Sequence, residues 1–147
     1  MLAMSTQTYA NHRQMVPLFH FVLLPVLLLT VVGSVVNFVK SVGDHERLYS
    51  ASLIVVLSIA MLGLAIIARV FALKAQDRAI RAEENLRHFV LTGKLLDPRL
   101  TVRQVIALRF APDSEFVDLS RRAGDERMAS DAIKRAVKNW RADTDRV

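Results

Sequence analysis

The segment Val16–Val39, VPLFHFVLLPVLLLTVVGSVVNFV, decides the fold that we expect for this chain. No Asp, Glu, Lys or Arg occurs between Arg13 and Lys40, and the stretch between Arg47 and Arg69 is equally free of charge. A helix of about 20 apolar residues crosses the ~30 Å hydrocarbon core of a bilayer, so each stretch is long enough to span a membrane. The sequence therefore predicts an all-α integral membrane protein built on a hairpin of two transmembrane helices.

Most of the charge lies after Leu73, in the second half of the 147 residues. The formal net charge of +6 would also fit a nucleic-acid-binding protein. Acidic residues are interleaved with the basic ones, however, and no nucleic-acid-binding motif occurs, so nucleic acid is not the expected partner. A basic side that faces anionic lipid explains the charge, and the lipid bilayer is the expected partner. The chain has no cysteine, which excludes disulfides and thiolate chemistry.

Basic residues near the ends of the spans predict the orientation, because they are enriched on the cytoplasmic side. Lys74, Arg78 and Arg81 follow the second stretch, whereas the loop between the stretches has no net charge. We therefore expect both termini inside and an uncleaved first span, since its apolar run is too long for a signal peptide. The expected organisation is an N-terminal cytoplasmic or interfacial segment (1–15), transmembrane helix 1 (16–39), an external loop (40–48), transmembrane helix 2 (49–73), its cytoplasmic extension (74–92) and a small helical tail (93–147).

One face of the first span carries small and weakly polar residues. Thr30, Gly33, Ser34 and Asn37 recur at helical spacing, and Ser41 continues the series. In lipid, such residues allow close approach of helices and hydrogen bonds between them. This face is expected to pack on another helix, most simply the second span. Pro25 should kink the same helix because it lacks a backbone N–H.

The second helix is expected to continue past the membrane, because good helix formers follow Leu73 and the first breaker is Gly93. Pairs such as Glu83–Arg87 and Glu84–His88 would support its exposed part. Small residues recur along it with the alternating spacing of a coiled coil. This seam consists of Ala51, Ser58, Ala65, Ala72, Ala79 and Leu86, with Ile54, Met61, Ala68, Ala75, Ala82 and Phe89 three residues further on. The seam predicts self-association or a closely packed partner helix, although alanine is also a common helix filler.

The tail is expected to form three short helices. A capping box at Thr101–Gln104 opens the first, Asp113 caps the second, and Ser130 caps a third that extends past Trp140. So short a tail should lean on the projecting helix, a second copy, a partner or the membrane surface. Either Trp140 belongs to a small core, or its helix contacts a partner or anionic lipid through a basic set. That set is Lys134, Arg135, Lys138, Trp140 and Arg141.

The histidines are the only plausible ligands for a metal or haem, and they do not form a paired motif. His20 is a weak cofactor-binding candidate, and a hydrogen bond near the inner interface is the alternative reading. No cofactor, metal site or catalytic residue is predicted. Arg69, inside the second span, is expected to extend toward the headgroups, although an ionisable residue there can also be functional.

Three parts of the chain resemble an uncharacterised family of small bacterial two-span inner-membrane proteins, a domain of unknown function. They are Tyr9–Arg13 with Pro17 and His20; Arg69–Lys74 with Gln76-Asp77-Arg78; and, in the tail, Arg103-Gln104, Ile106–Ala111, Ile133-Lys134 and Asn139–Asp143. The resemblance covers nearly the whole chain. It implies a multi-pass protein of the bacterial inner membrane with the same layout, and it implies no activity.

The sequence leaves three functions open. The first is a non-enzymatic membrane scaffold or accessory subunit that self-associates or binds a larger membrane complex. The second is a homo-oligomeric pore, which is weakened because the polar stripe from Thr30 covers only the outer half of its span. The third is a cofactor-bearing membrane subunit that uses His20.

Overall fold

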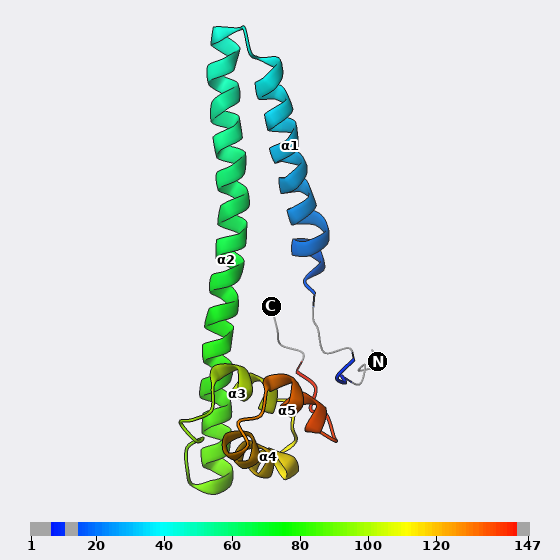
Figure 1. The fold of residues 1–147 in the computed structure, drawn as a ribbon, viewed down its shortest axis with the longest axis vertical. Helices are drawn as coiled ribbons and strands as arrows, with labels where there is room; N and C mark the ends of the chain where they lie inside the picture. Colours follow the sequence, from blue (N-terminus) through cyan, green and yellow to red (C-terminus); the bar gives the residue numbers. More distant parts are fainter. Residues whose placement is uncertain (1–6, 11–14, 144–147) are drawn as a thin grey trace. The chain divides into compact units, whose positions relative to one another are not determined.

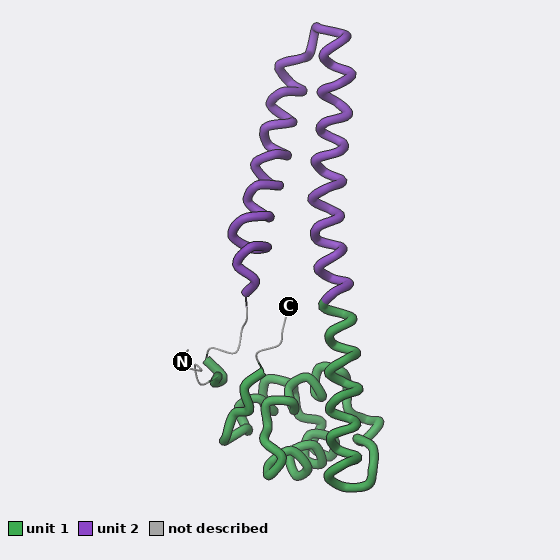
Figure 2. Tube along the Cα trace, turned by 180° about the vertical axis from the view of Figure 1, so that it is seen from behind, with its two compact units in different colours: residues 1–14, 73–147 green, residues 15–72 purple. Residues whose placement is uncertain are grey.

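The structure is a computed structural model that describes residues 7–10 and 15–143. Within these residues every regular element is a helix and no strand is present. The chain divides into two compact units, which are coloured in Figure 2: unit 2 contains residues 15–72, and unit 1 contains residues 1–14 and 73–147. Among the residues cited for the resemblance, Asn11, His12 and Arg13 lie outside the described part.

Unit 2 consists of helices that are long and apolar enough to cross a membrane. The π-helix η1 (Leu18–Leu23) and the α-helix α1 (Leu24–Lys40) form the first candidate span, and α2 (His45–Thr92) contains the second. Within unit 2 the two spans lie side by side and are joined by a short turn (Figure 1). The length and composition of the predicted spans are therefore confirmed.

The turn between the spans is made by local hydrogen bonds. Gly43 has a φ of 103°, in the left-handed region that glycine adopts without a steric penalty. The Asp44 side chain accepts a hydrogen bond from the Arg47 N–H at 3.2 Å and caps the helix that follows. As a result α2 begins at His45, a few residues before the expected start of the second transmembrane helix.

Pro25 is the second residue of α1 and directly follows the change from π-helix to α-helix. Proline cannot donate the backbone hydrogen bond that the preceding turn would require. A π-helical segment is one way in which a helix accommodates such an interruption. The kink expected at Pro25 stays a prediction; what the structure shows at this position is the change in hydrogen bonding.

Unit 1 packs α3 (Val102–Leu108), α4 (Asp113–Asp125) and α5 (Ser130–Ala136) around one apolar core. Its largest fully buried side chains are Phe110, Phe116 and Leu108. The capping box predicted at Thr101 is confirmed: Thr101 Oγ1 accepts from the Gln104 N–H, and the Gln104 side chain accepts from the Thr101 N–H.

The tail packs against the last part of α2. Of the expected supports for the tail, this is the projecting helix. Asn85 Oδ1 accepts a hydrogen bond from the Leu96 N–H at 2.9 Å, and the Arg87 guanidinium lies 4.3 Å from the Phe116 ring centre. The helix ends at Thr92, and Gly93 follows with a φ of 72°. The predicted stop at this glycine is confirmed.

The expected length of the last helix is wrong. It ends at Ala136, and Val137 is extended with a ψ of 120°. The N–H groups of Lys138 and Asn139 donate to the Glu115 carboxylate at 2.9 and 3.1 Å, so they are not available for another helical turn. Trp140 therefore lies outside the helix. The cap positions also differ by one residue, since Pro112 and Ala129 precede α4 and α5.

Candidate functional site

A buried pair of serines joins the two candidate spans. Ser34 and Ser58 are both 5% exposed, and their hydroxyl oxygens lie 2.9 Å apart. Each hydroxyl also lies within hydrogen-bonding distance of a carbonyl in its own helix, Val31 at 2.7 Å and Val55 at 2.9 Å. Small side chains at this contact let the helices approach closely.

The other residues of the predicted packing face of the first span are not buried. Thr30, Gly33 and Asn37 are exposed, and the Thr30 hydroxyl donates to the Val26 carbonyl in its own helix. Ser41, which continues the series, is buried and donates to the Asn37 carbonyl.

In the second candidate span, the residues that are buried belong to the first series of the predicted seam, which begins at Ala51. Ala51 and Ser58 are buried and Ala65 is partly buried, whereas Ala68 and Ala72 are exposed. The set three residues on, represented by Ile54, Met61 and Ala68, is exposed; Val55 and Leu62, four residues on, are partly buried instead. The predicted spacing of seven residues therefore agrees with the buried positions. The second series of the seam was placed three residues further on, whereas the partly buried residues lie four residues further on.

Beyond residue 73 the seam is exposed. We call Ala75, Ala79, Ala82, Leu86 and Phe89 the distal seam; all five are exposed, with Leu86 at 63% and Phe89 at 49%. Exposed apolar side chains in this part of α2 are not confined to the seam, since Val90 is 75% exposed and Leu91 is 41% exposed.

The tail covers the neighbouring side of the same helix, where Ile80 and Glu84 are buried, and the seam residue Ala79 lies at the edge of this side. Arg87 compensates the buried charge by donating to Glu84 Oε2 at 3.0 Å. The same guanidinium donates to Asp113 Oδ1 at 2.7 Å and to the Ala111 carbonyl at 2.8 Å. The predicted pairs Glu83–Arg87 and Glu84–His88 are replaced by this cluster, because the tail supplies acceptors that sequence spacing does not reveal.

A polar cavity of about 280 Å³ lies beside this cluster within unit 1. Arg109 is buried there and forms an ion pair with Asp143, Nε to Oδ2, at 2.8 Å. Gln76 Oε1 is buried at the cavity wall and has no hydrogen-bond donor. Glu83 and Arg141 are exposed residues that also line the cavity. Sequence reasoning missed this site, because its residues come from α2 and from the end of the tail.

The N-terminal segment binds to the tail within unit 1. Tyr9 Oη donates to Asp131 Oδ2 at 2.7 Å, and Arg135 Nη2 donates to Tyr9 Oη at 3.1 Å. Gln7 Oε1 accepts from the Asp143 N–H at 2.7 Å. The hydrogen bond from Tyr9 lowers the pKa of Asp131, and the bond to Tyr9 raises the pKa of Arg135.

The basic set predicted as a partner or membrane contact does not form one helix face. Trp140 is partly buried, and its ring lies 4.7 Å from the Phe110 ring, centre to centre. Arg135 pairs with Asp131, Lys134 is partly buried, and Lys138 and Arg141 follow the end of α5. The interpretation of Trp140 as a residue of a small core matches this packing.

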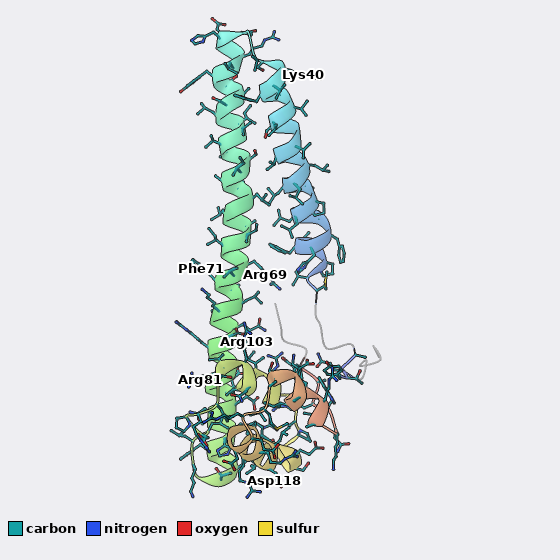
Figure 3. All side chains as sticks on the ribbon, in the orientation of Figure 1. Lys40, Arg69, Phe71, Arg81, Arg103 and Asp118 are labelled. Carbon is teal, nitrogen blue, oxygen red and sulfur yellow. The ribbon has the colours of Figure 1, made fainter. Side chains whose placement is uncertain are left out.

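His20 and Arg69 both lie in unit 2. His20 Nδ1 lies 2.9 Å from the Val16 carbonyl oxygen, and its ring meets Phe19 edge-on. The Arg69 guanidinium lies 5.6 Å from the Phe19 ring centre, and Figure 3 shows Arg69 and Phe71 extending from opposite sides of α2. Across residues 7–10 and 15–143, no three His, Asp or Glu side chains form a group that could hold a metal ion.

The chain matches, over residues 4–147, the family described as a family of unknown function (DUF6526). No curated protein and no solved structure matches it.

Proposed function

The chain belongs to the family of unknown function DUF6526, and we propose that it is a non-enzymatic scaffold or accessory subunit of the bacterial inner membrane. In this proposal two helices anchor the protein, and the distal seam binds a second copy or a helix of a larger membrane complex.

The two apolar helices support the membrane assignment, since large apolar side chains cover most of their surface. Leu29, at 71% exposed, and Leu57, at 63%, illustrate this exposure. In water such a surface would cause aggregation, whereas in a bilayer the lipid chains cover it.

The contacts of Tyr9 support the proposed topology. Tyr9 precedes the first span, and its partners Asp131 and Arg135 follow the second. A chain that spans the membrane twice brings both segments to one side, where they can form these bonds. The basic residues after Leu73 favour the cytoplasm as that side.

The exposed distal seam is the observation that carries the proposal of assembly. Leu86 lies 13 residues beyond Leu73 on α2, or about 20 Å along the helix axis at 1.5 Å per residue. Lipid chains do not reach that far from the proposed membrane boundary. An apolar face at heptad spacing in this position fits another helix, and alanines within it permit a close approach.

Disulfide cross-linking in native membranes tests this proposal, because the chain has no cysteine of its own. Two copies with the same orientation would place Ala79 near its counterpart, so Ala79→Cys should give an oxidised dimer. Arg78→Cys is the matched control, since Arg78 is also exposed but lies off the seam.

A photoreactive group at Ala82 extends the test to other partners. Adducts of higher mass with another protein would identify the chain as an accessory subunit. Equal cross-linking of Ala79→Cys and Arg78→Cys, with no adduct from Ala82, would contradict assembly through the seam.

A further inference from the structure

The cavity between α2 and the end of the tail contains an acceptor without a donor. Gln76 Oε1 is buried at its wall and accepts no hydrogen bond. Leaving a buried amide oxygen unpaired destabilises the fold, because the oxygen has lost its hydrogen bonds to water. A ligand that brings an N–H or O–H group into the cavity would remove this destabilising effect.

The buried charges around the cavity already have partners. Glu84 is paired with Arg87 at 3.0 Å, and Arg109 is paired with Asp143 at 2.8 Å. These two ion pairs leave the interior without an excess of either sign. The ligand therefore has to donate a hydrogen bond to Gln76 Oε1 and to match the charged residues at the rim of the cavity. It need not neutralise a buried charge.

The rim offers one charge of each sign. Glu83 and Arg141 both line the cavity. Among the residues that the structure describes, neither forms an ion pair with the other or with a third residue. A carboxylate and a guanidinium that flank one cavity without pairing suit a ligand with a cation at one end and an anion at the other. Arginine is well suited to phosphate because its guanidinium can donate two parallel hydrogen bonds.

We propose that this cavity binds the phosphoethanolamine headgroup of a membrane lipid. The primary ammonium group donates to Gln76 Oε1 and to the Glu83 carboxylate, and the phosphate accepts from Arg141. A primary ammonium group is required, because a quaternary one has no N–H to donate. The cavity, at about 280 Å³, is close to the lower limit of about 300 Å³ for small-molecule sites, which suits a headgroup better than a larger ligand.

The position of Gln76 along α2 favours a lipid as the source of this group. Gln76 lies three residues beyond Leu73, or about 5 Å along the helix axis. This part of the inference rests on the proposed membrane spans, because their cytoplasmic boundary then brings Gln76 to the depth of the headgroups.

Lipid retention by the full-length protein tests the proposal. The protein is purified in mild detergent, and phosphatidylethanolamine, phosphatidylcholine or phosphatidylglycerol is added at equal concentration before native mass spectrometry. We expect at least about tenfold tighter retention of phosphatidylethanolamine, which corresponds to ~1.4 kcal/mol. Glu83→Gln combined with Arg141→Gln should remove this preference, whereas Glu126→Gln combined with Arg121→Gln, on exposed residues of unit 1 that do not line the cavity, should keep it.

Gln76→Leu provides a second readout that does not depend on a folding defect. Without lipid, this variant should be as stable as the wild type or more stable, because it removes the unpaired acceptor. With phosphatidylethanolamine, only the wild type should gain thermal stability.

Equal retention of the three lipids, or retention that the cavity variants do not change, would overturn the proposal. The same headgroup could come from a lipid or from soluble phosphoethanolamine, so binding of the soluble compound is measured as well. Tight binding of soluble phosphoethanolamine without retention of the lipid would overturn the assignment to a lipid. Ala79 of the distal seam also lines the cavity. Retention is therefore measured on the monomer peak, where assembly through the seam does not affect the result.

Discussion

Ser34 and Ser58 share one buried contact in which three hydrogen-bonding distances compete for two protons. Their hydroxyl oxygens lie 2.9 Å apart, and each also lies within 3 Å of a carbonyl oxygen in its own helix. Each hydroxyl has one proton, so one of the three contacts lacks a hydrogen bond at any moment. The pair therefore contributes to helix contact through both hydrogen bonding and small size.

A double-mutant cycle on this pair should show modest coupling. Ser34→Ala and Ser58→Ala should be coupled by about 0.6 kcal/mol, the average for hydrogen bonds between membrane helices. The measurement is unfolding in mixed micelles, followed by helical circular dichroism. Ser50→Ala is the control, because the Ser50 hydroxyl donates only within its own helix, to the Arg47 carbonyl at 3.0 Å. Coupling as large with Ser50 as with Ser58 would contradict a direct serine contact.

Removal of Arg87 should destabilise unit 1 strongly. Arg87→Met leaves Glu84, whose side chain is 8% exposed, without its cation, at a cost of about 3–5 kcal/mol. The double variant with Glu84→Met should lose less, because both charges are then absent from the interior. Trp140 is the only tryptophan and packs against Phe110, so its fluorescence reports unfolding of this unit. A double variant that is less stable than Arg87→Met would argue against a buried charge pair.

Glu115 should make unit 1 less stable in acid. The N–H of Lys138, with further bonds from Asn139, lowers the pKa of Glu115 from its ordinary value of 4.5. A carboxylate with a lowered pKa stabilises the fold above its unfolded pKa, and this contribution is lost as the pH falls through the folded pKa. The free energy of unfolding of Glu115→Gln should thus be about 1 kcal/mol below wild type at pH 7.

The difference between Glu115→Gln and the wild type should shrink as the pH falls below about 4. Unfolding by denaturant at a series of pH values, followed by Trp140 fluorescence, measures it. A difference that stays constant down to pH 3 would show that the charge of Glu115 does not hold the end of the tail.

Labelling of single cysteines should show that the turn and the tail lie on opposite sides of the membrane. Val42→Cys, in the turn, should react with an impermeant maleimide in intact spheroplasts. Ser114→Cys, on an exposed position of α4, should react only after permeabilisation. Labelling of Ser114→Cys in intact spheroplasts would place the tail outside and contradict the proposed topology.

The helices could be predicted from the sequence wherever the signal was local. Apolar length indicated both candidate spans, Gly93 indicated the end of α2, and Thr101 with Gln104 indicated the start of α3. Each signal depends on a few neighbouring residues, which fix the local backbone hydrogen bonds.

Features that depend on distant residues could not be predicted. The end of α5 is set by Glu115, which takes the N–H groups of Lys138 and Asn139 from another helix. Arg87 is the partner of Glu84, and its guanidinium is held in place by Asp113 and the Ala111 carbonyl. Both acceptors come from the tail, so local spacing on α2 does not reveal this pairing. The small residues of the first span indicated a contact, but only Ser34 and Ser41 of this series are buried, and Thr30, Gly33 and Asn37 are exposed.

The mass of the intact particle tests the central claim most directly. The protein is extracted from native membranes in mild detergent and measured by native mass spectrometry, beside Leu86→Glu in the distal seam and Leu95→Glu, an equally exposed leucine off the seam. We predict a particle larger than one chain for the wild type and Leu95→Glu, and its dissociation in Leu86→Glu. A wild-type protein that is monomeric and carries no partner protein would contradict the proposed scaffold.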